Sequence, residues 1–152
     1  MKKILFALCG LFFLYVTSNA YATQCKATFV SSVNKELELE YFKQRAVEVT
    51  STAATREILP GNTTTIITVK DKGRSQGNRG DITPRVDITV FYTTATHGKS
   101  KLGHVRILAK STGCKFKFTD FDNTRFSMKK SSISSNFGGQ KAQYDISARG
   151  NR

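Results

Sequence analysis

Apolar and polar residues alternate along most of the chain after residue 57, which is the pattern of strands with one buried face. In "RVDITVFY" (85–92) the side chains expected to point inward are Val86, Ile88, Val90 and Tyr92. In "GCKFKFTD" (113–120) the inward set is Cys114, Phe116 and Phe118. Lys115 and Lys117 then point outward, so this second strand presents positive charge on its exposed face.

Other segments have the β-branched and aromatic composition of strands, namely "KATFVSSV", "TTTIITV", "GHVRILAK", "RFSMKK" and "AQYDIS". Clusters of turn-forming residues separate them, at 59–62, 70–85, 96–103, 111–113, 120–123 and 134–139. Strands at this spacing predict an all-β fold. We expect a single-domain antiparallel β-sandwich of about seven to eight strands.

Residues 35–49, "KELELEYFKQRAVEV", fit two structures. Leu37, Leu39 and Tyr41 alternate as in a strand, but Leu39 and Phe42 also belong to an apolar stripe with helical spacing. The β-branched "VEVTST" that follows favours the strand. A helix here would change the fold class to α+β.

The first 22 residues have the parts of a secretory signal peptide. Lys2 and Lys3 give a positive start, an apolar run follows, and Ala20-Tyr21-Ala22 has small residues at the two positions that signal peptidase reads. The apolar run covers 4–16, which is shorter than the roughly 20 residues of a membrane-spanning helix. We expect cleavage after Ala22 and export to the periplasm or the extracellular space.

The mature chain, residues 23–152, would then fold in an oxidising compartment. Of the three cysteines in the sequence, Cys25 and Cys114 remain after cleavage. An even pair in such a compartment predicts a structural disulfide. It would close a loop of roughly 90 residues and tie the start of the domain to a late strand.

The mature chain is strongly basic. Without Lys2 and Lys3 it has 22 basic residues against 11 acidic ones, a net charge of +11. Such a charge attracts anions, for example nucleic acid, acidic glycan, lipopolysaccharide or anionic lipid. It also keeps a protein soluble without any ligand, so charge by itself leaves both interpretations open.

The basic residues are not spread evenly, and ten of them form three groups that we treat as candidate binding residues. The first group lies in the 70–85 loop and consists of Lys70, Lys72, Arg74, Arg79 and Arg85. The second lies in or beside the next hairpin and consists of Lys99, Lys101 and Arg106. The third is Lys115 and Lys117. Because alternate loops of a sandwich emerge at the same end, we expect the first two groups to combine into one positive surface.

His97 and His104 flank "GKSKLG", which reads as a hairpin turn that would bring the two rings together. Paired histidines beside lysine and arginine are typical of acid–base cleavage of a phosphodiester. Exposed histidines that merely flank a turn have the same pattern. No third metal ligand lies in this segment, so the sequence predicts neither a metal site nor a cofactor.

Three functions remain open on this evidence. The leading hypothesis is an exported, non-enzymatic binding module for an anionic surface or polymer. The alternatives are a small secreted hydrolase, nuclease-like, that uses His97 and His104, and a structural or partner-binding periplasmic protein.

Overall fold

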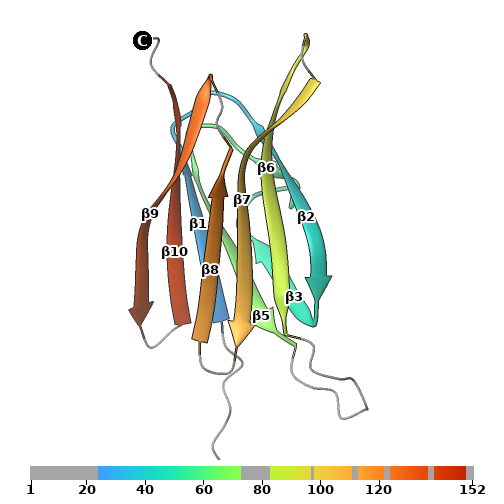
Figure 1. Cartoon of the computed structure of the whole chain (residues 1–152), viewed down its shortest axis with the longest axis vertical. Coiled ribbons are helices and arrows are strands. Elements are labelled where there is room, and N and C mark those ends of the chain that lie inside the picture. The colour runs from blue at the N-terminus through green and yellow to red at the C-terminus, as the bar shows by residue number, and fades with distance from the viewer. Residues whose placement is uncertain are drawn as a thin grey trace, which may run out of the picture.

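Ten β-strands form two five-stranded sheets that pack face to face (Figure 1). This computed structural model describes residues 24–72, 83–96, 98–110, 113–121, 124–136 and 139–149, and the predicted signal peptide lies outside them. The strands are β1 (Gln24–Ser31), β2 (Leu37–Arg45), β3 (Val47–Ser51), β4 (Ile58–Leu59), β5 (Thr64–Asp71), β6 (Arg85–Thr94), β7 (Gly98–Lys110), β8 (Gly113–Asp120), β9 (Phe126–Asn136) and β10 (Gly139–Ala148).

One sheet has the strand order β3-β5-β1-β10-β9, and the other has the order β4-β2-β6-β7-β8. We call them sheet A and sheet B. Neighbouring strands are antiparallel, except that β1 and β10 run parallel. The predicted all-β sandwich is confirmed, with ten strands in place of the expected seven to eight.

The ambiguous segment 35–49 forms strands from Leu37 onward, and it supplies one of the additional strands. It divides into β2 in sheet B and β3 in sheet A. Ala46, between them, has a φ of 49°, in the left-handed region that L-residues seldom adopt. The chain therefore leaves one sheet at Ala46 and enters the other, which a continuous strand could not do.

Alternating side chains from both sheets fill the space between them, as the period of two predicted. The largest fully buried residues include Phe29, Tyr144, Ile67, Ile88, Ile107 and Met128. The rings of Phe29 and Tyr144 stack with their centroids 5.4 Å apart, and the Phe118 ring lies 5.5 Å from Tyr144. Aromatic side chains from β1, β8 and β10 thus join the two sheets.

The predicted disulfide is confirmed. Cys25 on β1 and Cys114 on β8 are bonded, with their Cα atoms 5.7 Å apart. Cys25 is completely buried, and the bond links sheet A to sheet B across the core. A disulfide is compatible with an exported protein. No helix occurs among the described residues, and hence none there that could cross a membrane.

Candidate anion-binding face

The outer face of sheet B brings basic residues from three neighbouring strands together. Val105, Ile107 and Ala109 of β7 point into the core, so Arg106, Leu108 and Lys110 point outward. On this face Arg106 lies between Asp87 of β6 and Lys117 of β8, because the register pairs it with both. In the next row Leu108 lies between Arg85 and Lys115.

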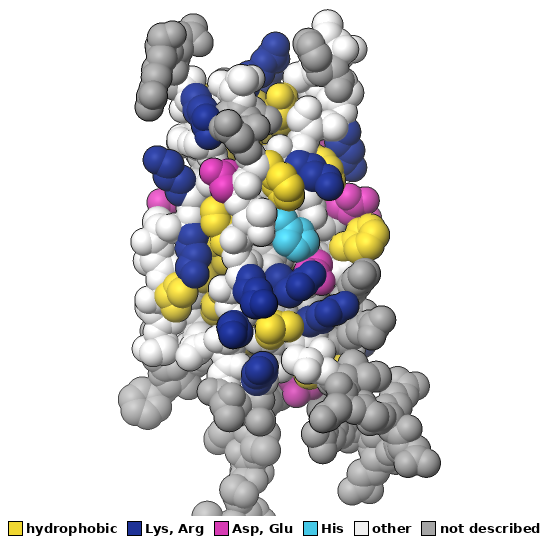
Figure 2. Space-filling view, viewed as in Figure 1, with side chains coloured by type: hydrophobic (Ala, Val, Ile, Leu, Met, Phe, Trp, Pro, Cys, Tyr) yellow, Lys and Arg dark blue, Asp and Glu magenta, His cyan; other side chains and the backbone are white. Residues whose placement is uncertain are grey.

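We call this surface the basic face, and its members are Arg85, Arg106, Lys110, Lys115 and Lys117. Strands lie about 4.8 Å apart and residues that share a face repeat about every 6.7 Å, so the five cations occupy roughly 10 by 13 Å. Figure 2 shows lysine and arginine side chains gathered over the lower part of sheet B. The three lysines are exposed, and no carboxylate among the described residues forms an ion pair with them.

One carboxylate, Asp87, lies beneath the basic face. Its side chain is only 3% exposed, and Arg106 Nε donates a hydrogen bond of 2.5 Å to its Oδ1. Arg85 Nε lies 3.9 Å from Oδ2. Since the face has five cations and one buried anion, it keeps a net positive charge of about four.

His104 bonds to the same oxygen of Asp87 as Arg106 does. Its Nε2 lies 3.1 Å from Asp87 Oδ1, and its Nδ1 lies 3.0 Å from Thr89 Oγ1. An ionised carboxylate only accepts hydrogen bonds, so Nε2 carries the proton in this contact. Both ring nitrogens are therefore bonded within the protein, and the ring of His104 on β7 links Asp87 and Thr89 of β6.

We expect Arg106→Ala to destabilise the fold by about 2 kcal/mol, because it leaves the buried Asp87 carboxylate without its shortest hydrogen bond. Breaking a fully buried pair costs roughly 3 to 5 kcal/mol, and Arg106 is partly exposed, which lowers the loss. Urea unfolding measures the change. The double variant Arg106→Ala/Asp87→Asn should recover much of it, whereas additive losses from the two substitutions would contradict this role for Arg106.

The second predicted group is divided. Arg106 belongs to the basic face, but Lys99 and Lys101 lie toward the opposite end of β7. Lys99 Nζ forms an ion pair of 2.8 Å with Glu38 and lies 4.5 Å from the centre of the Phe91 ring. The hydrogen bond from Lys99 lowers the pKa of the Glu38 carboxyl and raises the pKa of the lysine. Lys101 lies 5.6 Å from the ring of Phe121.

The first predicted group is also divided. Of its described members, Arg85 alone lies on the basic face. Lys70 is exposed on the outer side of sheet A, Lys72 follows the end of β5, and Arg74 and Arg79 lie outside the described residues. Among the described members of the first two groups, only Arg85 and Arg106 come together, beside Asp87, and Lys70, Lys99 and Lys101 lie elsewhere. The ten residues of β6 separate Arg85 from the hairpin, a length of about 30 Å.

The predicted hairpin turn over "GKSKLG" is also wrong. Residues 98–103 are extended and begin the 13-residue strand β7, with the β6–β7 turn before them. A strand of this length carries His104 about 20 Å from Gly98. The turn that was to bring the two histidines together is therefore not formed, and His97 lies outside the described residues.

Two residues on or beside the basic face were not predicted as binding residues from the sequence. Phe42 lies opposite Asp87 on the outer side of β2 and is 56% exposed. Lys110 extends the basic face at the end of β7. The strand pattern in "LELEYF" contained the signal for Phe42, because inward positions 37, 39 and 41 leave 38, 40 and 42 pointing outward.

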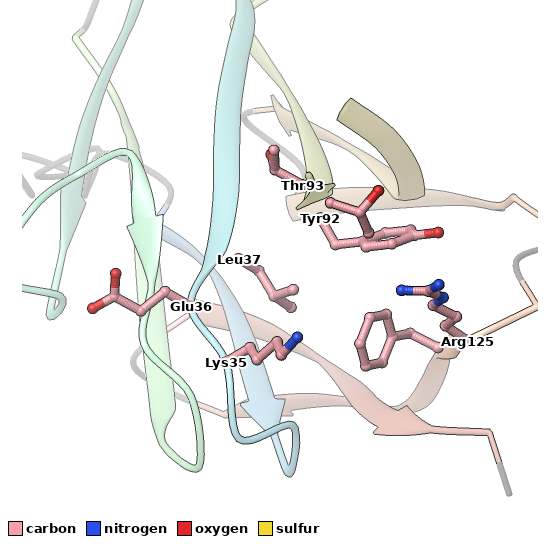
Figure 3. Close-up of a pocket in the computed structure, with 8 residues that line it drawn as sticks. Lys35, Glu36, Leu37, Tyr92, Thr93 and Arg125 are labelled. Carbon is pink, nitrogen blue, oxygen red and sulfur yellow. The ribbon is translucent and has the colours of Figure 1, made fainter. Parts of the chain in front are cut away.

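A small pocket lies at the other end of the sandwich. Lys35 and Arg125 point into it beside Tyr92 and Phe126, whereas Glu36 points away (Figure 3). Its volume of about 30 Å³ holds water but no organic ligand. Among the described residues, no three His, Cys, Asp or Glu side chains are grouped as metal ligands. The open basic face is therefore the stronger candidate site.

Fold and face together define a class, a disulfide-linked β-sandwich domain with a cationic sheet surface. The chain matches no protein-family model, and no curated protein is significantly similar to it. Its function must accordingly be argued from the residues themselves.

Proposed function

We propose that this protein is an exported, non-enzymatic module that binds an anionic polymer or surface on the basic face. The observation that carries the proposal is the convergence of Arg85, Arg106, Lys110, Lys115 and Lys117, from three strands, on one side of sheet B. Among the described residues, the carboxylate that lies beneath these cations is Asp87, which is buried and already bonded. The three exposed lysines form no ion pair with a described carboxylate, so their charges are available to a ligand.

The shape of the face favours a ligand with many charges over a single small anion. Exposed ammonium groups on a flat sheet each bind one anion weakly, because water and salt screen the attraction. A polymer or membrane offers several negative groups at once and releases several counterions. Lipopolysaccharide, acidic glycans, anionic lipids and nucleic acids all have this property.

Phe42 adds an apolar contact beside the charges. It lies two strands from Arg106, or about 10 Å, because the register runs from Phe42 through Asp87 to Arg106. An exposed ring at this distance can stack on a sugar or a base while the cations hold its acidic groups. This arrangement supports a ligand that combines rings or apolar groups with negative charge.

The test measures binding of the mature protein to heparin, lipopolysaccharide, anionic vesicles and a single-stranded oligonucleotide. We expect binding to at least one of them at low salt, with an affinity that falls steeply as salt rises. Neutral dextran and neutral vesicles are the controls. If none of the four anionic probes binds at low salt, the proposal is wrong.

The same samples distinguish binding from hydrolysis. The hydrolase alternative uses His97 and His104, and the two ring nitrogens of His104 are bonded to Asp87 and Thr89. We expect the heparin and the oligonucleotide to stay intact after long incubation. Cleavage that disappears in His104→Ala would favour the hydrolase instead.

A further inference from the structure

Strand β9 forms one edge of sheet A. It pairs with β10 on one side, and no described strand pairs with it on the other. Figure 1 shows β9 at the left border of the molecule, beyond β8 and β10. A long edge strand exposes unpaired N–H and C=O groups, and proteins usually cover such an edge or protect it with charge.

The second half of β9 lacks that protection. Lys129 and Lys130 are followed by Ser-Ser-Ile-Ser-Ser at 131–135, and all five of these residues are exposed. Ile133 is 56% exposed, and it is one of two large hydrophobic side chains so exposed among the described residues. It pairs with the buried Ala142 and so lies on the core side of sheet A, at a margin that sheet B leaves uncovered.

We propose that β9 pairs with β9 of a second copy of this chain, in antiparallel orientation and centred on Ile133. In this register Ile133 faces Ile133 of the other copy, and Ser132 faces Ser134. The regular pairing is centred on these three residues, because the register between β9 and β10 shifts at Ser131. Lys129 and Lys130 of each copy lie outside this central segment, so no lysine faces another lysine. Directly opposed residues lie about 5 Å apart, so the two isoleucines bury each other.

Charge and burial select this register from the alternatives. Sliding the strands toward their beginnings would place Lys130 opposite Lys130 of the second copy, and opposed like charges are destabilising. Intermediate registers avoid that clash but place Ile133 opposite serine, lysine or the fully buried Met128 rather than opposite another exposed apolar side chain. The small serine side chains allow the two edges to approach, and the result is one continuous ten-stranded sheet with a two-fold axis.

The orientation of the pair follows from the register. Opposed residues of an antiparallel pair lie on the same side of a sheet, so both copies have sheet B on the same side of the joined sheet. Both basic faces then point in one direction. If the proposed function holds, the dimer is a bivalent binder of an extended anionic polymer or surface, but the dimer itself does not depend on that function.

Cysteine cross-linking tests the register. We expect Ile133→Cys to form a covalent dimer under mild oxidation, since each new thiol faces its own copy. Ser132→Cys and Ser134→Cys should cross-link more readily when mixed than either does alone, because these two positions face each other. Unchanged melting temperatures would show that the exposed substitutions leave the fold intact. No covalent dimer, or equal cross-linking by every variant alone, would overturn the register.

Sedimentation tests the association itself. We expect the mature protein to dimerise with rising concentration, and more strongly at high salt, because two copies of net charge +11 repel each other. Ile133→Lys should be monomeric with an unchanged melting temperature. A monomeric wild-type protein at high concentration and high salt would overturn the dimer. If that monomer still binds anionic polymer, the dimer proposal is wrong and the proposed function stands. If the protein is a dimer that binds none of the probes, the proposed function is wrong and the dimer stands.

Discussion

Replacing Lys110, Lys115 and Lys117 with glutamine is expected to weaken polymer binding about a hundredfold near physiological salt. Each lysine near an anionic surface contributes about 1 kcal/mol, so three contribute about 3 kcal/mol, and every 1.4 kcal/mol is tenfold in Kd. The plot of log Kd against log salt should also become shallower, because fewer counterions are released. Titrations at several salt concentrations measure both effects.

A matched triple variant separates the basic face from net charge. Lys26, Lys70 and Lys141 lie on the outer side of sheet A, since their neighbours along the strands point into the core. Replacing these three with glutamine removes the same charge from the opposite side of the sandwich. We expect less than about a threefold change in Kd from this control. Equal losses in the two variants would mean that total charge, rather than the basic face, determines binding.

The fold was largely predictable because the period of two is a local property. The inward set of "RVDITVFY" is buried at Val86, Ile88 and Val90, as the alternation required. Strand order was not predictable in the same way. The parallel pairing of β1 with β10 joins residues more than a hundred positions apart, and no short pattern encodes it.

The site was only partly predictable, since nearness in the sequence proved to be a poor guide to nearness in space. Lys115 and Lys117 were correctly expected to point outward. Grouping the cations by loop failed because a strand carries successive basic residues to opposite ends of the molecule. Arg85 of β6 and Lys115 of β8 both pair with Leu108 of β7. The basic face therefore depends on the order and register of the strands in sheet B.

The burial of Asp87 could not be predicted from the alternation within its own strand. Alternation placed it on the outer face of β6, and it is there, yet it is only 2% exposed. Arg106 and His104 from β7 extend over it and bond to its carboxylate. Long side chains from a neighbouring strand can bury an outward residue, and only the register reveals which residues they cover.

Removing the disulfide is expected to have the largest effect on stability. Cys25→Ala/Cys114→Ala should lower the free energy of unfolding by about 4 to 5 kcal/mol, because the bond closes a loop with a sequence separation of 89. The chain-entropy model places this effect in the unfolded state, which becomes more expanded without the cross-link. The denaturant m-value should therefore rise along with the loss of stability.

Urea unfolding of the oxidised wild type and of the double variant measures both quantities. Among the described strands, β8 lies at the edge of sheet B and pairs with β7 alone, and the disulfide joins it to β1. Amide exchange in the double variant should therefore accelerate first on β8. Because β8 carries Lys115 and Lys117, the bond also holds two members of the basic face in position. A loss below about 1 kcal/mol with an unchanged m-value would contradict the loop-closure explanation.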